Sequence, residues 1–316
     1  MPEKTYEFRD TVFSAVHEIA RADRNVVVLT NDMGALGLEK IREELPAQVF
    51  NVGISEQNMM SMAGGLALAG KSVFVYGIVA HITARCFEQI KLDICLPALP
   101  VTLLGVGAGL SYGVDGPTHH GVEDIAILRA LGGLQIFNPA DGPCAASSVR
   151  AAYASRRPAY VRMDKEVLPE LYLPGEMNFS DGLGMPHEGN DAAIVSTGVL
   201  SWAARDAARK LDQKGVSVRV IDVFRLKPVN QENLAVLLKG IPMVVVVEEN
   251  VSNGGLGSIV AEVLALNGIS TQLRKFNLGN EFLLGSASRD WAAKTFGLNA
   301  DSIAAALEGL VVERVS

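Results

Sequence analysis

Two β-branched runs, VFVY at Val73–Tyr76 and VTLLG at Val101–Gly105, lie on either side of a helix-like stretch, Thr83–Ile94. Each run is short and apolar throughout, which is typical of a strand buried on both faces. Two buried strands joined through a helix favour a parallel pair with a crossover connection. This unit therefore predicts an α/β fold for the chain around it.

The same alternation continues on both sides of this unit. The pattern predicts further strands and helices at Val26–Thr30, Tyr160–Met163, Ala192–Thr197, Val216–Val223 and Met243–Glu248 (strands) and at Val12–Arg21, Glu56–Ala69, Trp202–Gln213 and Leu256–Leu266 (helices). A stretch dense in Gly and Pro, without periodicity, interrupts the series near residue 180. We therefore expect two doubly wound, mainly parallel sheet domains, at residues 1–170 and 190–316, joined by a linker at 171–189.

Composition excludes several classes of function. The net charge is −7, whereas a nucleic-acid surface needs clustered Lys and Arg. The N-terminus, Met1–Asp10, is too charged for a secretory signal, and the longest apolar runs fall far short of the roughly 20 residues of a membrane helix. The three cysteines lack metal-site or redox spacing. We expect a cytoplasmic protein that binds neither nucleic acid nor membrane.

Glu56 is the first candidate for chemistry. It follows a predicted strand in NVGISEQN (Asn51–Asn58) and falls in the first turn of a helix rich in Ala, Met and Gly. The helix N-terminus favours a carboxylate there, while the apolar neighbours are expected to raise its pKa. Such a group acts as an acid or as a hydrogen-bond partner for a heterocyclic nitrogen, or it simply caps the helix.

A polar loop, GVDGPTHHGVE at Gly113–Glu123, is the second candidate. Its Asp-Gly-Pro turn delivers two adjacent histidines to the start of the next predicted helix. Loops at the ends of strands are where α/β sheets place ligands. Taken alone, the loop is compatible with a functional or a structural role.

These segments together resemble the transketolase family. Gly53 to Met59 is similar to its G-x-x-E-x-x-M signature, and Asp115 to His119 resembles its D-G-P-T-H loop. Other matching segments, in the expected order, are Phe87–Ile90, Asn138–Asp141, Val246–Asn250 and Gly254–Gly257. The resemblance spans essentially the whole chain and identifies it with the pyrimidine-binding and C-terminal half of a split, two-subunit transketolase.

The resemblance implies roles for individual residues. Glu56 would hydrogen-bond the aminopyrimidine of thiamine diphosphate and favour its imino tautomer, while Ile78 and His81 would flank the ring. His119 would act catalytically beside the reacting carbon, and Asp115 would bind a sugar hydroxyl. The function that the resemblance implies is transfer of a two-carbon ketol unit between sugar substrates, expected to be sugar phosphates.

Arg162 and Arg9 match arginines that bind the substrate phosphate in the family. A planar guanidinium pairs bidentately with phosphate oxygens, which suits this task. The alternative for both residues is a solvated surface charge.

Two positions depart from the family pattern. The transketolase pattern has a further substrate-contacting histidine twelve residues before the loop histidine, where this chain has Gly107. The stretch before Phe87 usually carries aromatic residues and here reads Ile78-Val79-Ala80-His81-Ile82. Both departures predict a substrate preference that differs from the usual pentose phosphates.

The segment that binds diphosphate and metal in this family, G-D-G followed by Asn, has no counterpart in the sequence. We therefore expect no metal ligands in this chain, Mg²⁺ held by a separate N-terminal subunit, and an α₂β₂ assembly. The alternatives are a deoxyxylulose-phosphate-synthase-like acyloin-forming enzyme, the β subunit of an oxo-acid dehydrogenase, and a non-catalytic subunit.

Overall fold

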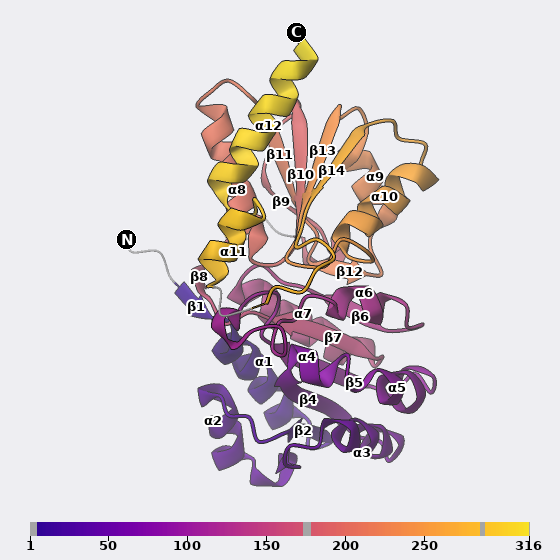
Figure 1. Ribbon diagram of the computed structural model, residues 1–316. Helices are drawn as coiled ribbons and strands as arrows, with labels where there is room; N and C mark the ends of the chain where they lie inside the picture. The colour runs from indigo at the N-terminus through magenta and orange to yellow at the C-terminus, as the bar shows by residue number, and fades with distance from the viewer. Residues whose placement is uncertain (1–4, 173–177, 285–287, 316) are drawn as a thin grey trace.

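The computed structural model describes residues 5–172, 178–284 and 288–315, and Figure 1 shows two sheets, one above the other. The lower, seven-stranded sheet has the order β12-β6-β7-β5-β4-β2-β3 and is parallel except at its β12 edge. Its strands are β2 (Val26–Thr30), β3 (Val49–Asn51), β4 (Ser72–Ile78), β5 (Val101–Val106), β6 (Gln135–Phe137), β7 (Ala159–Met163) and β12 (Arg225–Lys227).

Helices cover both faces of this sheet. The helical segments of the first half are α1 (Phe8–Ala22), α2 (Leu36–Glu44), η1 (Pro46–Gln48), α3 (Glu56–Leu68), α4 (Val79–Ile82), α5 (Phe87–Gln89), the π-helical η2 (Ile90–Cys95), η3 (Gly113–Asp115), α6 (Asp124–Arg129) and α7 (Gly142–Ser155). Alternate residues of each strand point to opposite faces, so Val75 joins the core under α3 while Phe74 and Tyr76 join the core under α1. A two-stranded ribbon, β1 (Thr5–Glu7) with β8 (Val167–Pro169), lies beside the sheet.

The upper sheet has the order β14-β13-β10-β11-β9. Its strands and helical segments are η4 (Phe179–Asp181), β9 (Gly184–His187), β10 (Ala192–Ser196), α8 (Leu200–Asp212), β11 (Val218–Asp222), α9 (Gln231–Leu238), β13 (Met243–Val247), α10 (Leu256–Leu266), β14 (Gln272–Phe276), α11 (Arg289–Thr295) and α12 (Ala300–Val315). The predicted α/β class with two mainly parallel sheets is confirmed.

Three details differ from the sequence-based expectation. Part of the expected linker is strand β9, an antiparallel edge strand, where Pro186 is tolerated because one side of the strand needs no hydrogen-bond donors. Strand β12 belongs to the second half of the chain in sequence, but it pairs with β6 of the first sheet. The expected helix at Thr83–Ile94 is a turn followed by α5 and η2.

Within the described residues, no helix is long and apolar enough to cross a membrane.

Candidate active site

Glu56 is the first residue of α3, at the carboxyl end of the sheet, and its side chain is buried. Its Oε1 accepts a hydrogen bond from Asn31 Nδ2 at 2.9 Å, and its Oε2 accepts one from Arg85 Nη1 at 2.8 Å. His81 lies beside the same carboxylate, with Nδ1 3.9 Å from Oε1. Two other segments, one with Asn31 and one with His81 and Arg85, therefore converge on this one carboxylate.

The expectation that burial raises the pKa of Glu56 is wrong. Burial does act to raise the pKa, but hydrogen bonds from the helix backbone, Arg85 and Asn31 outweigh it, and the net shift is downward. Glu56 is therefore an ionised carboxylate at neutral pH, with the Arg85 guanidinium as its counter-ion.

Three rings form a wall that runs away from Glu56. His81 meets His119 edge to face, with 5.2 Å between ring centroids, and His119 meets Tyr112 in the same way at 5.7 Å. Burial, helped by the nearby Arg85 charge, lowers the pKa of His81, so its imidazole is neutral and flat at neutral pH. Ile78, at the end of β4, is half-buried and packs against the core that contains Phe74 and Tyr76.

The two adjacent histidines of the loop have different surroundings. The His120 side chain is buried, with Nε2 2.9 Å from the Gly113 carbonyl oxygen, which is a structural contact within the loop. His119 is half-buried in the ring wall, and its Nδ1 lies 2.9 Å from Thr118 Oγ1. Asp115 is exposed at the end of η3. The loop therefore brings His119, and not His120, to the site.

Two cations, Lys165 and Arg9, lie near Tyr112, the last ring of the wall. The Lys165 ammonium lies over the Tyr112 ring, 4.1 Å from its centroid. Arg9 is half-buried at the start of α1, bonded through Nε to Glu7 Oε1 at 2.6 Å, and its charge acts on the hydroxyls of both Tyr76 and Tyr112. Neither Lys165 nor Tyr112 was predicted from the sequence, because neither belongs to a motif.

Arg162, expected to bind the substrate phosphate, lies in a buried ion pair. Its side chain, on β7, is 4% exposed, and its Nε lies 2.8 Å from Asp124 Oδ2. Its Nη2 bonds the other oxygen of Asp124 and the carbonyl oxygens of Gly121 and Glu249. Asp124 also accepts a hydrogen bond from the Tyr160 hydroxyl at 2.6 Å. Because the guanidinium bonds a buried carboxylate, Arg162 links the loop to both domains, and it is not the solvated surface charge that was the alternative.

Residues of the second domain also hold Leu110, just before the loop, and Asp164, just after β7. Glu249 Oε2 accepts from the Leu110 amide at 3.2 Å, and Arg289 Nη2 bonds both Glu249 and Asp164, at 2.6 and 2.8 Å. Burial acts to raise the pKa of Asp164, but the Arg289 charge outweighs it and the pKa is lowered. This charged network makes the geometry of the site depend on the contact between the two domains.

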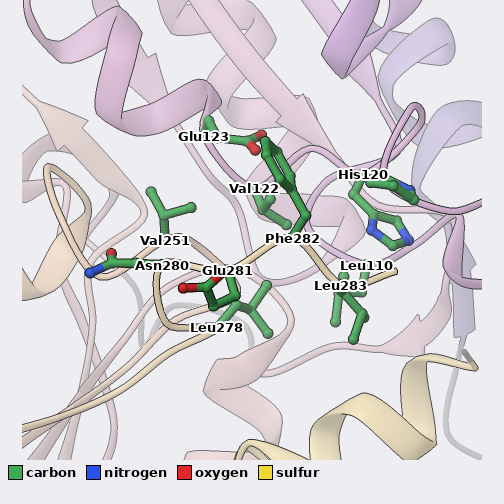
Figure 2. A pocket seen from close by; sticks show the side chains of 11 residues that line it. Leu110, His120, Val122, Glu123, Val251, Leu278, Asn280, Glu281, Phe282 and Leu283 are labelled. Atoms are coloured by element: carbon green, nitrogen blue, oxygen red, sulfur yellow. The ribbon is translucent and has the colours of Figure 1, made fainter. Parts of the chain in front are cut away.

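A separate cavity of about 180 Å³ lies between the loop and residues 278–283 of the second domain (Figure 2). Its lining is mostly apolar, and Figure 2 shows Glu123, His120 and Phe282 around it. Burial raises the pKa of Glu123. Glu56, His81 and Tyr112 do not line this cavity, so the hollow beside the loop is distinct from the Glu56 site.

Two domain families match nearly the entire chain. The pyrimidine-binding domain of transketolases matches residues 4–170, and the transketolase C-terminal domain matches residues 184–303. The chain belongs to the transketolase family. The sequence-based resemblance is thus confirmed, and the chain is a transketolase subunit that carries these two domains.

Known transketolase subunits of similar length are similar to this chain over most of it. One of the subunits of the apulose-4-phosphate transketolase of Phocaeicola vulgatus is 35% identical over 268 residues, 84% of this chain and 85% of that protein. A subunit of the 6-deoxy-6-sulfo-D-fructose transketolase of Clostridium sp. (strain MSTE9) is 32% identical over 305 residues, 93% of this chain and 91% of that protein. A solved structure described as a split gene transketolase, inactive beta4 tetramer, superimposes with a TM-score of 0.85 at 31% identity, covering 97% of this chain and 98% of that one.

Proposed function

We propose that this transketolase chain transfers a two-carbon ketol unit between sugar substrates, and that it does so only beside a separate subunit that binds the diphosphate and Mg²⁺ of thiamine diphosphate. In this reaction the C2–C3 bond of a ketose breaks, an aldose two carbons shorter leaves, and the two-carbon unit joins the aldehyde carbon of the acceptor. No net oxidation occurs. The observation that carries the proposal is the buried Glu56 at the head of α3, held by Asn31 and Arg85 beside His81.

The residues around Glu56 fit the aminopyrimidine end of the cofactor. The Glu56 carboxylate can hydrogen-bond a polar aromatic ring, and the apolar Ile78 and the neutral imidazole of His81 can pack against such a ring. The Asn31 Oδ1 atom is buried and has no hydrogen-bond partner among the described residues, which leaves one acceptor at the site unused. In the part of the chain that the structure describes, no group of three or more His, Cys, Asp or Glu side chains lies close enough together to hold a metal.

Thiamine diphosphate, when bound, supplies the electron sink that makes cleavage of a C–C bond beside a carbonyl possible. Glu56 would accept a hydrogen bond from N1′ of the aminopyrimidine and hold the proton at that atom. Arg85 and Asn31 would fix the carboxylate in position for this bond. His81 and Ile78 would pack against the ring and exclude water.

On the substrate side, His119 would donate a hydrogen bond to the oxygen on which charge develops, and Asp115 would bind a sugar hydroxyl. Arg9 and Lys165 would provide the positive charge for an anionic sugar, the role that the family resemblance gave to Arg9 and Arg162. Two relatives are named for a sugar phosphate and a sulfonated sugar, which supports an anionic substrate without identifying it.

The relatives also support the proposed assembly. Two are named as one subunit of a transketolase, and the similar solved structure is described as an inactive tetramer of β chains. We infer an α₂β₂ complex in the cytoplasm, with each active site formed between one α and one β chain.

The test is the product spectrum of the two-chain complex. With a ketose donor, D-glyceraldehyde, thiamine diphosphate and Mg²⁺, mass spectrometry should detect an acceptor lengthened by two carbons and a donor shortened by two. If the complex instead condenses pyruvate with the aldehyde and releases CO₂, the enzyme is an acyloin-forming synthase. If no donor is converted, the proposed function is wrong.

A further inference from the structure

Gly107 stands where the family resemblance expects a substrate-contacting histidine. Its φ is +93°, in the left-handed region that favours glycine. A Cβ atom at this position would lie 2.1 Å from Cε2 and 2.3 Å from Cδ2 of Tyr112. The Tyr112 ring therefore occupies the space into which a side chain at position 107 would extend.

The position of Tyr112 is fixed from several sides. Its ring meets His119 edge to face at 5.7 Å, and Lys165 covers it at 4.1 Å. The buried Asp164 holds both flanking segments, because its Oδ1 accepts from Ser111 Oγ at 3.1 Å and from the Lys165 amide at 2.7 Å. Arg289 neutralises Asp164 from the second domain. This ring is thus a built part of the wall rather than a mobile surface side chain.

The Tyr112 hydroxyl is available for a ligand. It makes no hydrogen bond to another residue that the structure describes, whereas the hydroxyls of Tyr6, Tyr153, Tyr160 and Tyr172 bond to carboxylates. Burial is the main cause that raises the pKa of Tyr112, so the phenol keeps its proton at neutral pH and can donate. Arg9, whose charge acts on Tyr112 more strongly than the opposing charge of Asp115, and Lys165 favour an anionic acceptor there.

Resting on the proposed function, we propose that Tyr112 is a specificity-determining residue of this transketolase. Its hydroxyl donates a hydrogen bond to the terminal oxyanion of the sugar, a phosphate or a sulfonate, between Arg9 and Lys165. Its ring replaces the missing side chain at position 107 and closes that part of the site. The family's histidine at position 107 is thus replaced by the phenol of Tyr112, which also donates a hydrogen bond but stays uncharged at neutral pH.

The test is Tyr112→Phe in the two-chain complex, with saturating D-glyceraldehyde as a neutral acceptor. Fructose 6-phosphate and 6-deoxy-6-sulfofructose serve as anionic donors, and erythrulose serves as a neutral one. Loss of a hydrogen bond to a charged acceptor should raise KM for the preferred anionic donor roughly 10- to 100-fold. Its kcat should change less than about twofold, because the anionic group sits on C6 of the donor whereas the bond that breaks is C2–C3. Both constants for erythrulose should stay unchanged, and the two anionic donors distinguish phosphate from sulfonate.

Tyr153→Phe is the matched control, because it removes a hydroxyl that bonds Asp23 outside the site. It should change none of the constants. The proposal is overturned if Tyr112→Phe leaves KM for both anionic donors unchanged, if it raises KM for erythrulose equally, or if the wild-type complex prefers erythrulose to both anionic donors. In each of these cases, the proposed function still holds if the wild-type complex converts erythrulose and the Glu56→Gln complex does not. If the wild type converts no donor, both proposals fail.

Discussion

Glu56→Gln in the two-chain complex is expected to lower ketol transfer at least about 100-fold, the usual loss for a positioned acid–base group. Glutamine has nearly the same shape, but its amide cannot carry the negative charge that N1′ requires. Steady-state rates at saturating cofactor measure the effect. Thermal unfolding of the variant should stay close to that of the wild type, because the amide oxygen can still accept from Asn31, and Arg85, whose side chain is 47% exposed, can turn to solvent.

Glu44→Gln is the matched control, since Glu44 pairs with His17 on α1, away from the site. It should leave turnover unchanged. Near-normal ketol transfer by Glu56→Gln would contradict the assignment of Glu56 to the cofactor.

Arg85→Gln tests how the charge on Glu56 is maintained. Since Arg85 helps to lower the pKa of Glu56, its removal should raise that pKa. The ionised form is the one present above the pKa, so the acidic limb of the pH–rate profile should move to higher pH. If the acidic limb does not move, the hydrogen bonds from the backbone and Asn31 are enough to keep the pKa of Glu56 low without Arg85.

The second large effect concerns stability. Asp124→Ala leaves the Arg162 guanidinium buried without its counter-ion, since the two side chains are 1% and 4% exposed. Breaking a buried pair in this way costs about 3–5 kcal/mol. For a domain of this size, the melting temperature should fall by roughly 10 °C. Calorimetric unfolding of the purified chain is the measurement.

Arg150→Ala is the control for this prediction, because Arg150 pairs with Glu18 at the surface. Its free energy of unfolding should change by no more than about 1 kcal/mol. The double variant Asp124→Leu/Arg162→Met should be more stable than Asp124→Ala, because it buries no unpaired charge. If Arg162→Met unfolds like the wild type and raises KM only for phosphorylated donors, Arg162 binds substrate after all.

Much of the fold was predictable because its strands are buried on both faces. Short runs such as Val101–Gly105 are apolar throughout, which is typical of a strand in the middle of a parallel sheet. The helix Leu256–Leu266 was predicted with both of its ends correct. Strand β9 was missed because an edge strand needs little apolar sequence. The pairing of β12 with β6 joins segments about 90 residues apart, and no local pattern records such a contact.

The candidate site was predictable only where a motif marks it. Glu56 and His119 stand in motifs, and the structure places Glu56 beside His81, whose ring contacts His119. The direction of the Glu56 pKa shift was missed because Arg85 comes from a segment 29 residues away. The burial of Arg162 was missed for the same reason, since its partner Asp124 lies 38 residues earlier in the chain.

A calorimetric titration with thiamine diphosphate and Mg²⁺ tests whether this chain holds only one half of the cofactor site. The titration is performed on this chain alone, on the partner subunit alone, and on their complex. We expect negligible binding to this chain and tight, Mg²⁺-dependent binding to the complex, weakened by Glu56→Gln. Tight Mg²⁺-dependent binding to this chain alone would contradict the claim that it is one half of a split transketolase site.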